Sequence, residues 1–117
     1  MMRGGRWAAL FLAAASGMFA ADRIPPPWEK PLRSGRYLYR ENCSVCHEIN
    51  RPRQGKKFGP SLFRLFQNEK LPLTRGKPTE EYVASKIRKG GPVMPAFGDY
   101  LNDRQIGDVI EYIRTKH

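Results

Sequence analysis

The segment CSVCH at residues 43–47 contains both cysteines of the chain, three positions apart, and a histidine follows the second cysteine directly. The chain has 117 residues, of which 40% are hydrophobic and 27% are charged, a composition that suits one small domain. A domain of this size buries only about 60 to 65% of the surface of its unfolded chain. We therefore expect an additional group to complete the core.

Three kinds of site use a C-x-x-C pair: a redox disulfide, half of a zinc site and, when histidine follows, covalent haem attachment. A thioredoxin-like dithiol needs a strand, a helix and a strand around the motif, but a helical pattern precedes Cys43 and a polar loop follows His47. A closed zinc site needs four ligands, and the chain would have to add the terminal His117 to the motif. The pattern therefore favours haem over the other two interpretations.

The spacing of CSVCH suits haem c for a chemical reason. Two thiols, here those of Cys43 and Cys46, can add across the two vinyl groups on one edge of the porphyrin. The next residue, His47, is then held beneath the iron, where an imidazole can bind it. The sequence thus predicts one covalently bound haem c.

The first residues predict export. Arg3 and Arg6 precede an apolar run over residues 7–15, and small residues follow up to Ala21, which is the pattern of a secretory signal peptide. The apolar run is shorter than the roughly 20 residues of a membrane-spanning helix. We assign residues 1–21 to a signal peptide and expect a periplasmic protein, with retention of this segment as a membrane anchor as the alternative.

Residues 22–33 include the sequence RIPPPWEKP, whose prolines favour an extended chain. We predict a linker or an N-terminal arm here, with Trp28 packed on the domain that follows at residues 34–117. Ser34 is a candidate N-cap for a first helix.

The face of this first helix carries residues at helical spacing, namely Gly35, Leu38, Tyr39 and Asn42. A glycine within a helix costs up to about 1 kcal/mol relative to alanine. Gly35 therefore suggests that another helix crosses closely at this point.

Two further helices have clear start signals. Thr79 is expected to cap a helix over residues 80–89 that Gly90 ends, and Asn102 with Gln105 predicts a capping box at the start of a last helix over residues 103–116. A brief helix is expected within SLFRLF at residues 61–66, and no segment reads as a strand. The predicted fold class is all-α: three main helices and a short one packed around a covalently bound haem.

With these motifs the chain resembles the class I monohaem cytochromes c over residues 34–116, which is most of the mature chain. CSVCH resembles the haem attachment motif of that family. The resemblance implies thioether bonds at Cys43 and Cys46 and proximal ligation of the iron by His47.

Two loops and one helix contact extend the resemblance. FGPSL at residues 58–62 resembles the family segment whose proline carbonyl accepts the other N–H of the proximal histidine, which implies that role for Pro60. GGPVMPAFGDYL at residues 90–101 resembles the distal-ligand loop and implies Met94 as the sixth ligand. The resemblance also implies that Tyr112 packs on Gly35.

Independently of the family, Met94 is the one methionine outside the predicted signal peptide. It lies between two amphipathic helices in a loop rich in glycine and proline, which suits the presentation of one side chain. The expected wall of the haem pocket consists of Leu62, Phe63, Leu65, Phe66, Ile87, Phe97, Leu101, Val109 and Ile113.

An iron ligated by both His47 and Met94 has no free position for a substrate, so we expect a one-electron carrier and no enzyme activity. Two alternatives stay open. One is a haem-based catalyst or gas sensor with a labile sixth ligand, and the other is a dedicated cytochrome subunit of a periplasmic dehydrogenase.

The charge of the chain points to acidic redox partners. Without residues 1–21, 19 basic and 11 acidic residues remain, a net charge of +8. Such a charge favours encounter with acidic docking surfaces, here those of a dehydrogenase, an oxidase or a bc-type complex. Export argues against nucleic acid as a partner, and a membrane is expected only if the anchor is retained. The candidate docking residues are Lys56, Lys57, Lys70, Lys77, Arg88 and Lys89.

Overall fold

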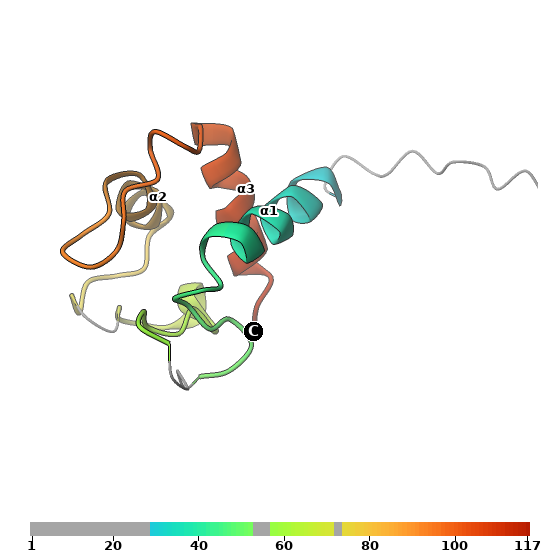
Figure 1. Cartoon of the computed structure of the whole chain (residues 1–117). Coiled ribbons are helices and arrows are strands. Elements are labelled where there is room, and N and C mark those ends of the chain that lie inside the picture. The colour runs from blue at the N-terminus through green and yellow to red at the C-terminus, as the bar shows by residue number, and fades with distance from the viewer. Residues whose placement is uncertain (1–28, 53–56, 72–73) are drawn as a thin grey trace, which may run out of the picture.

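The computed structural model describes residues 29–52, 57–71 and 74–117 (Figure 1). These residues contain three α-helices and one short 3-10 helix, joined by loops. In chain order they are α1 (Glu29–Asn42), η1 (Leu65–Gln67), α2 (Glu80–Lys89) and α3 (Asp103–Arg114). These residues contain no strand, and the prediction of an all-α fold with three main helices and a short one is confirmed. The predictions for residues 1–21, Trp28 and Lys56 lie outside the described residues.

Helix α1 begins at Glu29, before the predicted N-cap at Ser34, so that prediction is wrong. Residues 29–33, which the sequence assigned to a linker or arm, belong to the helix. Pro31 is compatible with this start because it lies in the first turn, where backbone N–H groups have no acceptor within the helix. Residues 22–28 of the predicted arm lie outside the described residues.

The starts of α2 and α3 follow the sequence signals. The hydroxyl of Thr79 accepts a hydrogen bond from the backbone N–H of Tyr82 at 3.2 Å. Asn102 and Gln105 form the predicted capping box, in which each side chain accepts from the backbone N–H of the other residue, at 2.9 and 3.0 Å. Helix α2 ends at Gly90, whose φ of 69° is available to glycine at little cost.

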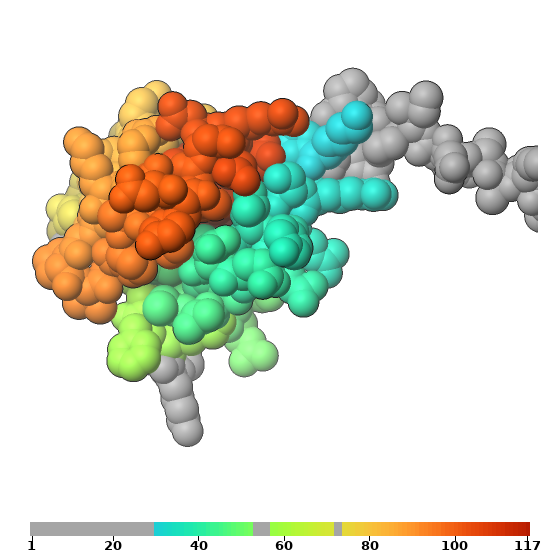
Figure 2. All heavy atoms as spheres, turned by 45° about the horizontal axis from the view of Figure 1, so that its top comes forward, coloured from blue at the N-terminus to red at the C-terminus, as the bar shows by residue number. Residues whose placement is uncertain are grey.

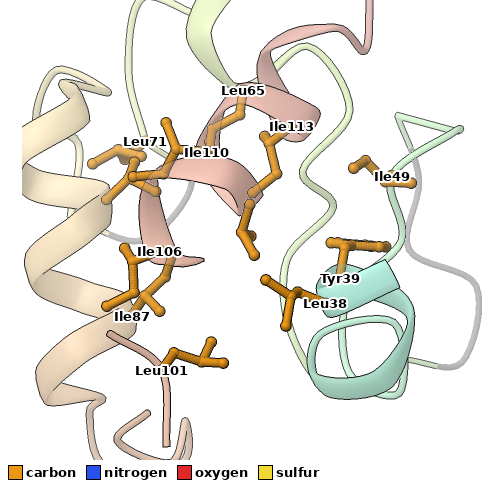
Figure 3. Close-up of a cluster of buried hydrophobic side chains, with 12 residues drawn as sticks. Leu38, Tyr39, Ile49, Leu65, Leu71, Ile87, Leu101, Ile106, Ile110 and Ile113 are labelled. Carbon is orange, nitrogen blue, oxygen red and sulfur yellow. The ribbon is translucent and has the colours of Figure 1, made fainter. Parts of the chain in front are cut away.

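Helix α3 supplies the centre of the core, between α1 on one side and α2 on the other (Figure 3). Its apolar stripe is almost fully buried and consists of Ile106, Val109, Ile110 and Ile113. Leu38 and Tyr39 of α1 and Ile87 of α2 pack into the same cluster. Leu65 of η1 and the loop residue Leu71 are also buried in it.

Helices α1 and α3 cross at Gly35. A Cβ atom at this position would overlap the backbone carbonyl of Asp108 and lie 2.9 Å from the Cβ of Tyr112. The rings of Tyr112 and Tyr39 contact each other at a tilt of 53°, with centroids 5.6 Å apart. The expected contact of Tyr112 with Gly35 is therefore present, and it explains a glycine within a helix.

One side chain of α3 connects three elements at the surface. The guanidinium of Arg114 lies 4.6 Å from the ring centroid of Phe66 in η1 and 2.7 Å from the carboxylate of Glu80 in α2. Phe66 is partly buried against the core, and its neighbour Leu65 is buried within it. Within the described residues, no helix is both long and apolar enough to cross a membrane.

Candidate functional site

A cavity of about 420 Å³ lies where the segment after α1, the faces of α2 and α3 and the loop between these two helices meet. All five site residues named from the sequence line this cavity: Cys43, Cys46, His47, Pro60 and Met94. In Figure 2, the orange atoms of the loop before α3 lie beside the green atoms of the segment that follows α1. Residues that are far apart in the chain therefore form one site.

The CSVCH segment continues the path of α1 for one more turn. The N–H of Cys43 donates to the carbonyl of Tyr39 at 2.8 Å, and the N–H groups of Cys46 and His47 both donate to the carbonyl of Cys43, at 3.1 and 2.9 Å. Residues separated by three and four positions in such a turn share one side. This local fold places the two thiols and the imidazole together at the cavity.

The imidazole of His47 is oriented by the segment at residues 58–62. Its Nδ1 lies 2.8 Å from the carbonyl oxygen of Pro60, which is the contact that the family resemblance implied. With the proton on Nδ1, the ring donates to Pro60 and its Nε2 keeps a free lone pair. Gly59 allows this approach, because a Cβ there would lie 2.5 Å from Cε1 of the imidazole.

The backbone carbonyl of His47 is held from two other elements. It accepts a hydrogen bond from the hydroxyl of Tyr39 at 2.8 Å and another from the ammonium of Lys57 at 3.1 Å. Burial, and then the nearby Cys43 and Glu48, raise the pKa of Tyr39, so its hydroxyl stays protonated and available as a donor. The sequence placed Tyr39 only on a helix face and Lys57 only among docking residues, so both contacts were missed.

Cys43 and Cys46 form no disulfide with each other, and both are partly buried. Burial, together with the proximity of Cys46, raises the pKa of the Cys43 thiol to about 11. Redox-active cysteines instead have a lowered pKa, because the thiolate is the reactive form. The environment of Cys43 thus argues against a catalytic dithiol.

Met94 is presented by a loop that is tied to the end of α2. Its carbonyl accepts from the N–H of Gly91 at 2.9 Å, and the N–H groups of Phe97 and Gly98 donate to the last turn of α2 at 3.0 and 3.1 Å. The positive φ of Gly90 turns the chain so tightly that a Cβ there would lie 2.5 Å from the Met94 carbonyl. The Met94 side chain is half-buried, packs against the core and lines the cavity.

The residues at the cavity fit haem c better than a zinc ion. Among the described residues, no group of three or more His, Cys, Asp and Glu side chains is placed to hold a metal ion, and His117 is exposed. A thiol pair for two covalent bonds, an imidazole nitrogen and a thioether sulfur form the donor set for a c-type haem. Apolar walls from α2 and α3 suit the faces of a porphyrin.

Six of the nine predicted wall residues line the cavity: Leu62, Leu65, Ile87, Phe97, Val109 and Ile113. The prediction is wrong for Phe63, Phe66 and Leu101. The ring of Phe66 packs under Arg114 instead, and Leu101 is buried among the helices.

The cavity wall also contains side chains that the sequence analysis did not name for it. Val83 and Lys86 of α2 line the cavity with Ile87. Helical spacing could have found both, because Val83 lies four residues before Ile87 and Lys86 lies three residues after Val83. The loop residues Pro92 and Val93 extend the wall beside Met94.

Comparison with known proteins shows the family of this chain. A family model described as cytochrome c oxidase, cbb3-type, subunit III matches residues 30–113. Cytochrome c6 of Bryopsis maxima is 28% identical over 82 residues, which cover 70% of this chain and 88% of that protein. Cytochrome c6 of Diacronema lutheri is 26% identical over 85 residues, which cover 73% and 95% of the two chains.

A solved structure, cytochrome c6 from the diatom Phaeodactylum tricornutum, is similar with a TM-score of 0.54 and 28% sequence identity. The similarity covers 71% of this chain and 90% of that chain. Because the family model matches well over half of the chain, the protein belongs to the cytochrome c oxidase, cbb3-type, subunit III family and is a class I monohaem c-type cytochrome, an electron carrier that binds one covalent haem c.

Proposed function

We propose that the protein transfers single electrons between redox proteins through a haem c that is bound to Cys43 and Cys46 and ligated by His47 and Met94. The observation that carries this proposal is that all four side chains line one cavity, with His47 Nδ1 held 2.8 Å from the Pro60 carbonyl. The haem supplies the one-electron couple between ferrous and ferric iron.

Pro60 and Met94 have distinct roles in this proposal. The carbonyl oxygen of Pro60 accepts a hydrogen bond from the Nδ1–H of His47. This bond fixes the tautomer that leaves Nε2 free to ligate and increases the basicity of the ring. The thioether of Met94 favours ferrous iron and raises the reduction potential relative to a second histidine. Because its loop is bonded to α2, Met94 stays in place during the cycle.

The cavity walls limit the access of water. Val83 and Ile87 of α2 and Val109 and Ile113 of α3 are buried and present apolar side chains to the cavity. A low-polarity environment disfavours the extra positive charge of ferric iron and so raises the potential further. Little rearrangement is then needed when an electron enters or leaves, which is the requirement for a carrier rather than an enzyme.

We place this carrier in the periplasm, with residues 1–21 as the export signal. Its partners are redox proteins with acidic docking surfaces, such as a dehydrogenase, an oxidase or a bc-type complex. The exposed Lys70, Lys77 and Lys89 support attraction to such surfaces, whereas Arg88 is paired with Asp103 at 2.7 Å. The description of the matching family favours an oxidase among these partners.

The test of the ligand set is the visible spectrum of the holoprotein, oxidised and reduced. We expect a low-spin c-type spectrum with the weak far-red band of methionine sulfur on ferric iron, and we expect Met94→Ala to lose that band. Tyr100→Ala is the matched control, because Tyr100 follows Met94 in the same loop but is 79% exposed and does not line the cavity. A wild-type spectrum without the band, together with carbon monoxide binding to the reduced native protein, would instead favour the catalyst or sensor.

A further inference from the structure

Lys57 bends back over the turn that carries the attachment residues. Its half-buried ammonium donates to the backbone carbonyls of Ser44 and His47, the latter at 3.1 Å. These two carbonyls belong to the CSVCH segment itself. Lys57 therefore contacts the backbone carbonyl of His47, the residue whose imidazole is the proposed proximal ligand.

Lys57 brings a full charge to a turn whose other described donors are neutral. The carbonyl of Cys43 accepts from backbone N–H groups of the turn, and the carbonyl of Cys46 accepts from the N–H of Gly59 at 2.7 Å. The second donor to the His47 carbonyl is the neutral hydroxyl of Tyr39. Hydrogen bonds from a charged donor are shorter and stronger than neutral ones.

The carboxylate of Glu48 interacts with this ammonium electrostatically. The carboxylate of Glu48 accepts from the N–H groups of Ile49 and Asn50, both at 3.0 Å, and these bonds lower its pKa, with a smaller contribution from Lys57. Lys57 donates directly to the carbonyls of Ser44 and His47 within the turn, whereas the Glu48 carboxylate accepts from N–H groups that follow the turn. Of the two charges, the positive one is therefore in direct contact with the backbone of His47.

We propose that Lys57 is a positioning residue that holds the His47 backbone and raises the reduction potential of the haem with its positive charge. The inference rests on the proposed ligation by His47. A fixed positive charge near the iron stabilises the ferrous state, which has one positive charge fewer than the ferric state. The proposal adds a specific residue to the determinants of potential, which otherwise are the axial ligands and burial.

The experiment is a spectroelectrochemical titration of the holoprotein with three variants. Lys57→Met removes the charge at nearly constant size, Lys57→Arg keeps it, and Lys89→Met is the control for net charge because Lys89 is exposed and does not line the cavity. At a fixed ambient potential, we expect Lys57→Met to lower the ferrous-to-ferric ratio by about two- to tenfold, the range for one charge at roughly 10 Å in a partly screened site. Lys57→Arg and Lys89→Met should stay within about twofold of the wild type.

A purely structural role for Lys57 would destabilise both oxidation states equally and leave the ratio unchanged. A ratio for Lys57→Met equal to that of Lys89→Met would therefore overturn the proposal. If Lys57→Met yields no holoprotein, Lys57→Gln replaces it, with the same expectation. Failure of the ligand assignment is recognised separately, because the wild-type spectrum would then lack the methionine band before any variant is compared.

Discussion

The imidazole of His47 lies so close to Gly59 that a Cβ at this glycine would come within 2.5 to 2.9 Å of three ring atoms. The next residue, Pro60, accepts the hydrogen bond from Nδ1. The close approach of Gly59 and the hydrogen bond to Pro60 therefore orient the imidazole ring together.

Gly59→Ala is expected to displace the His47 ring from Pro60. Overpacking of this kind costs about 1 to 3 kcal/mol, and we expect that loss in the free energy of unfolding of the holoprotein, measured with guanidinium. A visible spectrum should change at the same time, because the proximal ligand is reoriented. Gly76→Ala is the control: the nearest atom to its added Cβ is 3.6 Å away, so it should change stability by less than about 0.5 kcal/mol. Equal effects of the two substitutions would contradict the contact.

Removal of the haem is expected to abolish the cooperative fold. In the proposed site the haem fills a cavity of about 420 Å³, and at about 24 cal/mol per Å³ a closed empty space of this size would cost about 10 kcal/mol, which is an upper bound because water can enter this one. That cost is similar to the whole stability of a small domain, about 5 to 15 kcal/mol. The chain expressed without a haem attachment system should thus show no sharp thermal transition by circular dichroism. A transition as sharp as that of the holoprotein would rule this out.

Gly35→Ala should open the crossing of α1 and α3. The added Cβ would meet the Asp108 carbonyl and the Cβ of Tyr112, which are backbone or nearly rigid atoms, so we expect a loss of about 1 to 3 kcal/mol in unfolding free energy. Gly107→Ala is a matched control within α3, because nothing lies within 4 Å of its added Cβ. It should stabilise by up to about 1 kcal/mol, the helix preference of alanine. The prediction fails if both substitutions stabilise.

Asn102→Ala should remove the N-cap of α3. Its side-chain oxygen accepts from the Gln105 N–H at 2.9 Å, and the loss of such a cap costs about 1 kcal/mol. Denaturant unfolding measures the loss, and Asn102→Asp, which keeps an oxygen acceptor, serves as the control. An unchanged midpoint for Asn102→Ala would show that the cap contributes nothing.

Local signals predicted much of the fold because they act within a few residues. Thr79 and Asn102 mark helix starts through their own hydrogen bonds, and the stripe of α3 follows from the helical period. Gly35 revealed a long-range contact, since a glycine within a helix has a cost that only close packing explains. The start of α1 was missed because Pro31 was interpreted as a break, although the first helical turn accepts proline.

The site residues that belong to a sequence motif were predictable. The contacts of long side chains were not, because they depend on residues that lie far away in the chain. Cys43, Cys46, His47, Pro60 and Met94 were named from motifs, and all five line one cavity. Lys57 was one of several lysines, and no local pattern indicated that its ammonium would bind the carbonyl of His47, ten residues earlier. Phe66 was assigned to the pocket because Arg114, distant in the chain, gave no local signal of its cation–π contact.

Helices α1 and α3, the first and last helices of the described chain, are in contact at their crossing. The segment between Asn42 and Asp103 therefore has both of its ends held at this contact. Cys43 follows directly after the first of these helices, and Met94 comes shortly before the second. If the crossing separates, the proximal and distal sides of the cavity lose their common support. Unfolding and loss of the proposed Met94 ligand should then occur as a single cooperative event, with no intermediate that keeps an intact redox centre.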